Sequence, residues 1–216
     1  MGMSFIRARN DEQKNIRLEQ IRSAAQDLFD TEPYEKITLA SIAKKLDFSR
    51  VNLYNYVSTK EEIYLLLTTD EMSGFFQDIL DTFEGIPAIT SEEFSLLWAE
   101  TLFRHERLLK LCSILFSIIE KNVTVQSLAE FKKQLFIDIE RVYPMLKRLL
   151  PGIPEQSILT FLDYQLHHIA GLYPAVTLNE IQREAIRISG IPYEAKDFVS
   201  AFSEFLIIVL SGLEHS

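Results

Sequence analysis

Residues 38–57, TLASIAKKLDFSRVNLYNYV, are the stretch of sequence that decides the predicted fold. Apolar residues recur at helical spacing over 39–46, and Thr38 stands where it can cap the start of that helix. A four-residue connection, 46–49, then leads into a second, shorter helical segment. The stretch therefore predicts a helix, a tight turn and a second helix.

The second helix, residues 50–56, is too short to be stable alone, because isolated helices below about 12 residues are marginal in water. Leu53 and Val57, with Phe48 from the turn, are expected to anchor it against the preceding helices. Its other faces then carry side chains that point outward. These are Arg50, Val51, Asn52 and Asn55, with Tyr54 at the border.

A rigid helix that presents arginine and asparagine fits the major groove of DNA, because these side chains pair bidentately with guanine and adenine edges. Arg50 is the first candidate for base readout, and Val51 suits contact with a thymine methyl group. Ser49 at the cap and Lys60 at the start of the next helix are candidates for phosphate contacts. Two alternatives stay open: a three-helix packing unit with a solvated polar face, and Tyr54 as a half-buried aromatic that closes the small core.

The whole chain reads as all α-helical. Apolar residues recur at helical spacing almost throughout, no Asn-Gly or Asp-Gly hairpin turn is present, and only 7 Gly and 7 Pro are available for turns. Ser or Thr caps followed three residues later by Glu indicate helix starts, and Gly-Ile-Pro segments indicate helix ends. The predicted helices are 13–31, 39–46, 50–56, 59–83, 91–108, 109–121, 124–150, 155–173, 178–189 and 194–213.

Composition argues against several classes of protein. The single cysteine, Cys112, excludes an intrachain disulfide and a cysteine-based zinc cage. The four histidines form no HExxH pattern, and no GxSxG, GxGxxG or GxxxxGK motif occurs, so we expect no metal, no cofactor and no enzymatic activity. No apolar run approaches the roughly 20 residues of a membrane-spanning helix, and the start lacks a secretory signal, so a cytoplasmic protein is expected.

The net charge of −9 is unevenly distributed along the chain. Residues 1–60 hold 10 Lys and Arg against 8 Asp and Glu, whereas residues 61–216 hold 12 against 23. The second part also holds 12 of the 15 phenylalanines, and therefore the larger apolar interior. The two parts are expected to face different partners.

A further pattern of spaced residues runs through residues 17–67. Its members are Ile21, Ala24, Ala25, Leu28, Phe29, Thr38, Ile42, Ala43, Ser49, Leu53, Tyr54, Lys60, Glu61, Glu62 and Ile63. Residues 17–67 thereby resemble the DNA-binding domain of the TetR family of bacterial transcription regulators, whose pattern has Ile-x-x-Ala-Ala-x-x-Leu-Phe, a Thr before an Ile-Ala helix, a Ser before Leu-Tyr, and then Lys-Glu-Glu. Asp47 replaces the usual glycine of the turn, and aspartate tolerates a left-handed backbone at some cost.

The resemblance implies a helix-turn-helix DNA-binding domain in residues 1–60 and a helical ligand-binding and dimerisation domain in residues 61–216. The DNA-binding residues that it implies are Thr38, Ser49, Arg50, Val51, Asn52, Tyr54, Tyr56 and Lys60. The implied partners are double-stranded operator DNA, a small and largely apolar effector, and a second copy of the chain.

The candidates for the wall of a ligand cavity are large apolar residues with a few polar tips, because small-molecule sites have this composition. They are Phe75, Phe76, Phe83, Trp98, Phe103, Cys112, Phe116, Phe136, Tyr143, Tyr164 and His168. Ordinary core packing is the alternative for each of them, and Cys112 is expected to be an unreactive buried thiol.

Within the predicted helix 194–213, residues 198–210 are apolar nearly all round, which predicts burial on more than one face. With the helix at 155–173, this segment is expected to form a four-helix seam between two protomers related by a two-fold axis. The candidate interface residues are Leu159, Leu162, Leu166, Phe198, Phe202, Phe205 and Val209.

The sequence thus predicts a ligand-responsive regulator, a repressor that binds a pseudo-palindromic operator as a homodimer and is released by a small molecule. A helical carrier of small molecules without DNA readout is the alternative. An enzyme built around Asp163, His167 and His168 has only the proximity of these residues in the sequence in its favour.

Overall fold

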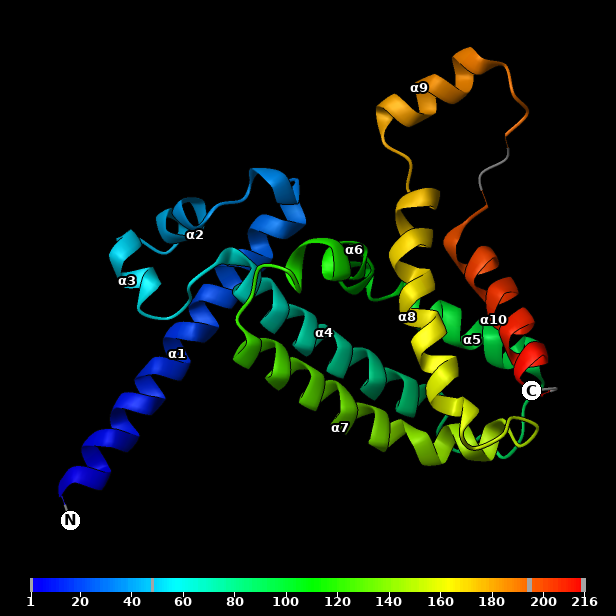
Figure 1. Cartoon of the computed structure of the whole chain (residues 1–216), viewed down its shortest axis with the longest axis horizontal. Helices are drawn as coiled ribbons and strands as arrows, with labels where there is room; N and C mark the ends of the chain where they lie inside the picture. The colour runs from blue at the N-terminus through cyan, green and yellow to red at the C-terminus, as the bar shows by residue number, and fades with distance from the viewer. Residues whose placement is uncertain (1, 48, 194–195, 215–216) are drawn as a thin grey trace. The chain divides into compact units, whose positions relative to one another are not determined.

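The computed structural model describes residues 2–47, 49–193 and 196–214, with side chains described from residue 13 onward except at residue 50. Within these ranges the regular structure is helical and no strand occurs, which confirms the all-α prediction (Figure 1). The helices are α1 (Gly2–Thr31), α2 (Leu39–Lys45), α3 (Arg50–Tyr54), α4 (Lys60–Thr82), α5 (Ser91–Phe103), α6 (Glu106–Ile114), α7 (Val125–Leu149), α8 (Ser157–Val176), α9 (Glu180–Ser189) and α10 (Phe198–Glu214). A short 3₁₀ helix, Tyr34–Lys36, follows α1, and a π-helical segment, Leu115–Ile119, follows α6. Among these helices, none is long and apolar enough to cross a membrane.

Several helix boundaries differ from those predicted, and two of the differences have a clear physical reason. α1 begins at Gly2 instead of residue 13, because the apolar period begins only at Leu18 while an established helix extends through polar residues at little cost. The break predicted between residues 108 and 109 falls earlier, at His105, whose φ of −95° and ψ of 56° leave the helical region. A 3.0 Å contact between His105 Nε2 and Asp78 Oδ2 holds the side chain at this break.

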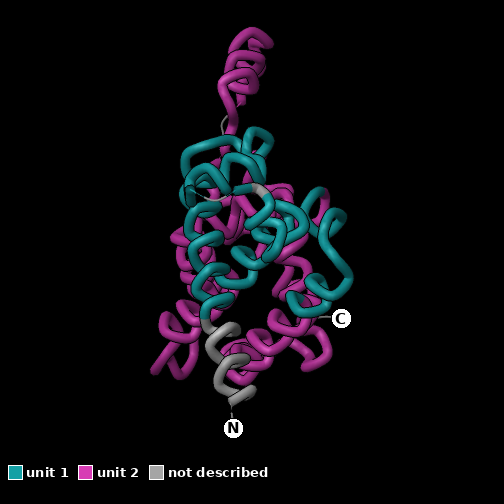
Figure 2. Tube along the Cα trace, turned by 90° about the vertical axis from the view of Figure 1, so that its left-hand side faces the viewer, with its two compact units in different colours: residues 1–70, 118–131 teal, residues 71–117, 132–216 magenta. Residues whose placement is uncertain are grey.

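The chain divides into two compact units (Figure 2). The first comprises residues 1–70 and 118–131, and the second comprises residues 71–117 and 132–216. α4 and α7 each contribute residues to both units. The predicted domain boundary lies at the start of α4, whereas the two compact units divide within that helix.

The first unit has a small core to which α1, α2 and α3 each contribute. Ile21, Ile42 and Leu53 are at most 1% exposed, and Val57 is 5% exposed, so two of the three predicted anchors of α3 are buried. Aromatic rings extend this core at the start of α4, where the ring centroids of Tyr34 and Tyr64 lie 5.2 Å apart. The helices of this helix-turn-helix are too short to be stable alone, so the burial of these side chains holds them together.

The turn between α2 and α3 has the left-handed residue that the sequence suggested. Thr38 caps α2, its side chain accepting a 3.1 Å hydrogen bond from Ser41 N. After α2, Asp47 adopts a φ of 55°, the one positive φ among described non-glycine residues. Its N–H donates to Lys44 O at 3.3 Å, which closes the last turn.

The second unit is built around a cluster of aromatic rings. Phe83, Phe94, Trp98 and Phe161 are at most 1% exposed, and the centroids of Phe94 and Trp98 lie 5.4 Å apart. α10 packs on both α5 and α8, and α6 also packs on α8. α4 and α7 also bury side chains in this unit, among them Phe75, Ile79 and Leu146.

α9 is the exception in the second unit, because none of its residues is buried. Ile181 and Ile188 are 80% and 71% exposed, and Figure 1 shows α9 beyond the ends of α8 and α10, which the chain connects through it. A capping box at Asn179, in which Gln182 takes part, begins this helix, and Gly190 ends it with a φ of 65°. Local signals alone therefore set its length.

We expect Asp47→Gly to raise the free energy of unfolding by about 0.5–1 kcal/mol, because a Cβ at left-handed φ is strained and glycine has none. Urea or thermal denaturation followed by circular dichroism measures the change. Asp47→Ala retains the Cβ and loses the local polar group, so it is the matched control and should lower stability. A glycine variant no more stable than the natural protein would contradict the interpretation of this turn.

Candidate nucleic-acid interface and apolar cavity

α3 presents an exposed face on a capped and anchored helix. The Ser49 hydroxyl oxygen accepts a 3.2 Å hydrogen bond from Asn52 N, which caps the first turn. Val51 is 73% exposed and Tyr54 is 58% exposed, so Tyr54 lies on the outward face and does not close the core. Asn52 and Asn55 are also exposed, whereas Leu53 between them is buried.

One residue of the predicted surface and one predicted anchor fall outside this description. The backbone of Arg50 begins α3, but its side chain lies outside the described residues, as does Phe48 altogether. The role of Arg50 in base readout therefore stays a prediction. Thr38 is exposed at its cap, and Tyr56 is partly exposed directly after α3.

Lys60 has a structural role that the sequence did not indicate. Its Nζ donates hydrogen bonds to Tyr34 O at 2.9 Å and Ile37 O at 2.8 Å, and lies 3.9 Å from the centroid of the Tyr34 ring. Burial lowers the pKa of Lys60, against the opposing effect of Glu61 and Glu35. Two of the three ammonium donors are thus used within the chain, and the phosphate contact expected of Lys60 stays a prediction.

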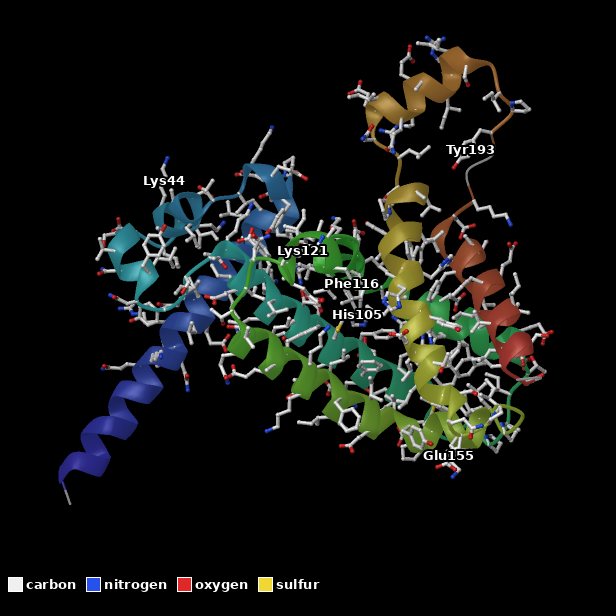
Figure 3. The ribbon with its side chains drawn as sticks, viewed as in Figure 1. Lys44, His105, Phe116, Lys121, Glu155 and Tyr193 are labelled. Carbon is white, nitrogen blue, oxygen red and sulfur yellow. The ribbon has the colours of Figure 1, made fainter. Side chains whose placement is uncertain are left out.

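Lys44 is an exposed cation that the sequence analysis did not name. It lies in the last turn of α2 and extends away from the helix (Figure 3). Its neighbour Lys45 pairs with Asp27 at 3.0 Å, so of these two lysines Lys44 is better placed for an external phosphate. Consecutive lysines directly before the turn were the signal that could have identified it.

The second unit contains an apolar cavity of about 290 Å³. Residues of α4, α5, α6, α7 and α8 form its wall. The lining residues are Met72, Phe75, Phe76, Trp98, Leu102, Leu108, Cys112, Leu135, Ile139, Leu159, Leu162, Asp163, Gln165, Leu166 and Ile169. This volume lies at the lower end of the roughly 300–1,000 Å³ typical of small-molecule sites.

The cavity contains some of the aromatic residues predicted for it. Phe75, Phe76, Trp98 and Cys112 line the wall, and burial raises the pKa of the Cys112 thiol to about 12. The aliphatic part of the wall was not predicted, although Leu102 lies one helical turn after Trp98 and could have been found from that spacing.

The other predicted wall residues lie away from this cavity, because a residue type does not determine the helix face on which it lies. Phe83 is in the aromatic cluster described above. Three of them stack on another ring: Phe103 stacks on Phe198, Phe116 (labelled in Figure 3) on His167, and His168 on Phe205. The ring centroids of His168 and Phe205 lie 3.7 Å apart. Phe136 and Tyr164 are 54% and 49% exposed, and the Tyr143 hydroxyl donates to Glu155 O at 3.5 Å. A role of these residues in ligand binding stays a prediction.

The predicted interface residues divide into three groups. Leu159, Leu162 and Leu166 line the cavity. Phe198 and Phe202 are at most 3% exposed within one chain. Phe205 and Val209 are partly exposed on α10. A role of all seven in dimerisation stays a prediction, and α10 owes much of its apolar character to packing on α5 and α8 of the same chain.

The third constellation considered from the sequence is an open surface pair. Asp163 Oδ2 and His167 Nδ1 lie 3.4 Å apart, with both side chains more than half exposed. Over the described residues, no group of three His, Cys, Asp or Glu side chains is arranged to hold a metal ion.

Two family descriptions match this chain, and together they cover most of it. Residues 21–67 match "Bacterial regulatory proteins, tetR family", and residues 69–216 match "Tetracyclin repressor-like, C-terminal domain".

The chain belongs to the TetR family.

The TetR family assignment confirms the predicted function at the level of a ligand-responsive, DNA-binding transcriptional regulator. Among solved structures, the chain is similar to the fatty acid degradation regulator FadR from Bacillus halodurans, with 15% identity and a TM-score of 0.49 over 91% of this chain and 95% of that one. A search of curated proteins finds no match.

We expect Lys60→Met to lower the free energy of unfolding by about 1–3 kcal/mol, because Tyr34 O and Ile37 O lose a charged donor. Chemical denaturation measures the effect. Lys44→Met is the matched control, because it removes an exposed lysine without a described ion pair and should change stability by less than about 0.5 kcal/mol. Equal effects of the two substitutions would contradict the structural role of Lys60.

Proposed function

We propose that this TetR family member is a homodimeric repressor that binds a pseudo-palindromic operator and leaves it when a small, largely apolar molecule occupies the cavity of the second unit. The observation that carries the proposal is the exposed face of α3, where Val51, Asn52 and Tyr54 stand outward on a helix held by buried Leu53. A regulator of genomic DNA acts in the cytoplasm, where its operator is.

The proposed contacts of α3 follow from the chemistry of its side chains. Arg50 pairs with a guanine, Asn52 with an adenine, and Val51 packs on a thymine methyl group. Ser49, Thr38, Tyr54, Tyr56 and the remaining donor of Lys60 contact the sugar-phosphate backbone and set the register. Two copies of α3 then read half-sites about one helical turn, roughly 34 Å, or a multiple of it apart.

The proposed dimer uses the outer faces of α8 and α10. His168 and Phe205 stack across these helices, so the faces on either side of this contact form one continuous surface. Tyr164 lies one turn from His168, and Ile208, 72% exposed, lies next to Phe205 along α10. Exposed glycines on both helices, Gly171 and Gly212, permit close approach of a second copy.

The proposed coupling between ligand and DNA runs along α4. This helix begins at Lys60, which is bound to Tyr34 and Ile37, and it supplies Met72 and Phe76 to the cavity wall. A ligand shifts the protein between two arrangements only to the extent that it binds one of them more tightly. Release of DNA therefore requires a ligand whose fit depends on the position of α4.

We expect Arg50→Ala and Asn52→Ala each to weaken specific operator binding about 10- to 100-fold, because each removes a bidentate base contact. The operator comes from selection of genomic fragments on the purified protein, and footprinting gives the affinity. Lys133→Ala, an exposed cation on α7, is the control and should have little effect.

The same measurement at increasing salt separates the regulator from an apolar carrier. Operator affinity should fall steeply because restored counterions compete for the phosphates, whereas capture of an apolar ligand barely responds. If the Arg50→Ala and Asn52→Ala proteins protect the operator at the same concentration as the unsubstituted protein, the proposed readout is wrong.

We expect Ile208→Glu to convert the dimer to a monomer, because it places a charge in an apolar surface that a second copy covers. Analytical ultracentrifugation measures the mass. Val125→Glu, at an 87% exposed position at the start of α7, is the matched control and should leave the mass unchanged. A dimer that persists in the Ile208 variant would exclude this face of α10.

A further inference from the structure

The described residues that line the cavity include no basic residue. Of its lining residues only Asp163 carries a formal charge, and its side chain is 61% exposed and pairs with His167, outside the apolar interior. A ligand carboxylate in this cavity would lose its hydration without gaining a cation, and would be repelled by Asp163.

Two buried polar groups nevertheless belong to the wall. Trp98 is 1% exposed, and its indole Nε1 has no hydrogen-bond partner among the described residues. Gln165 is 4% exposed and donates from Nε2 to Phe161 O at 3.3 Å, whereas no described group bonds to its Oε1. An indole N–H only donates, so an acceptor on the ligand is the group that it lacks.

The surroundings of these two groups are of low polarity. The Cys112 thiol on the same wall is fully buried, and burial raises its pKa to about 12. The cause of this shift is desolvation, which also opposes the transfer of an anion from water into this part of the cavity. A neutral acceptor, such as a carbonyl oxygen, avoids the penalty and still satisfies the indole.

We infer that the cavity takes neutral, mainly apolar molecules that carry one hydrogen-bond acceptor, of the ketone, ester or lactone class, and that it rejects the corresponding carboxylates. The inference rests on the proposed function in that it names the class of effector for the same cavity. Trp98 Nε1 donates to the acceptor oxygen of the ligand, and the Gln165 amide is available for a second hydrogen bond to the ligand. The aliphatic and phenyl groups of the wall cover the rest of the ligand.

Three probes of nearly equal shape separate the effects of the hydrogen-bond acceptor, the negative charge and the apolar contacts. Benzylacetone has a neutral ketone, 3-phenylpropanoate has a carboxylate at the same place, and butylbenzene has no acceptor. Because Trp98 is the single tryptophan of the chain and lies in the wall, its fluorescence reports directly on occupancy of this cavity. At pH 7.5 we expect benzylacetone to bind at least about tenfold more tightly than 3-phenylpropanoate.

Substitution then tests the individual groups, with calorimetry as the readout because Trp98→Phe removes the fluorophore. Trp98→Phe should weaken benzylacetone about 2- to 10-fold and leave butylbenzene nearly unchanged. Phe94→Leu is the matched control: it alters the same ring cluster outside the wall, so it should affect all three probes alike. Asp163→Asn should strengthen 3-phenylpropanoate a few-fold and leave benzylacetone unchanged.

Binding of 3-phenylpropanoate as tight as that of benzylacetone would overturn the inference, as would a Trp98→Phe protein that loses butylbenzene as strongly as the ketone. If 3-phenylpropanoate binds more tightly than benzylacetone and also releases the operator, the inferred ligand class is wrong but the proposed repressor function stands. The expected order of affinities without operator release by benzylacetone would support the inference and contradict the proposed regulation.

Discussion

Burial of Leu53 and Val57 is the constraint on which the DNA-facing part of the molecule depends. α3 has five residues, which is too few for its own hydrogen bonds to hold it folded. Its stability therefore comes from apolar side chains that leave water, and the same burial fixes the direction of the outward residues. Val51, Asn52 and Tyr54 are consequently presented on a rigid support, which is what readout of base edges requires.

Lys60 extends this support into α4. Its ammonium bonds two carbonyl oxygens from the segment between α1 and α2, and it lies against the ring of Tyr34. The Tyr34 hydroxyl in turn donates to Glu61 Oε1 at 2.8 Å, one residue further along α4. The first turn of α4 is thus fixed to the helix-turn-helix by hydrogen bonds in addition to apolar packing, so displacement of this helix would act on the DNA-binding unit from its first residue.

The sequence predicted those features whose causes are local. Thr38 and Ser49 cap helices because their hydroxyl oxygens accept from an N–H three residues on, and Asp47 takes the left-handed conformation that such a turn needs. What the sequence could not predict is which face of a long helix meets which neighbour. Phe202 is an example: its apolar side chain suggested a contact between protomers, and the sequence did not indicate that α10 also buries this side chain within one chain by packing on two other helices.

A cavity lined by apolar groups is a region where packing interactions are missing, and a ligand that fills it restores them. The energy of this packing has little direction, because any apolar molecule of the right size supplies it. Discrimination among such molecules must come from the few polar atoms in the wall, since a buried donor left without a partner destabilises the complex by more than one additional methyl group stabilises it. Trp98 and Gln165 are the buried polar side chains of this wall, so the specificity of the second unit depends on them, and its affinity on the surrounding leucine, isoleucine and phenylalanine side chains.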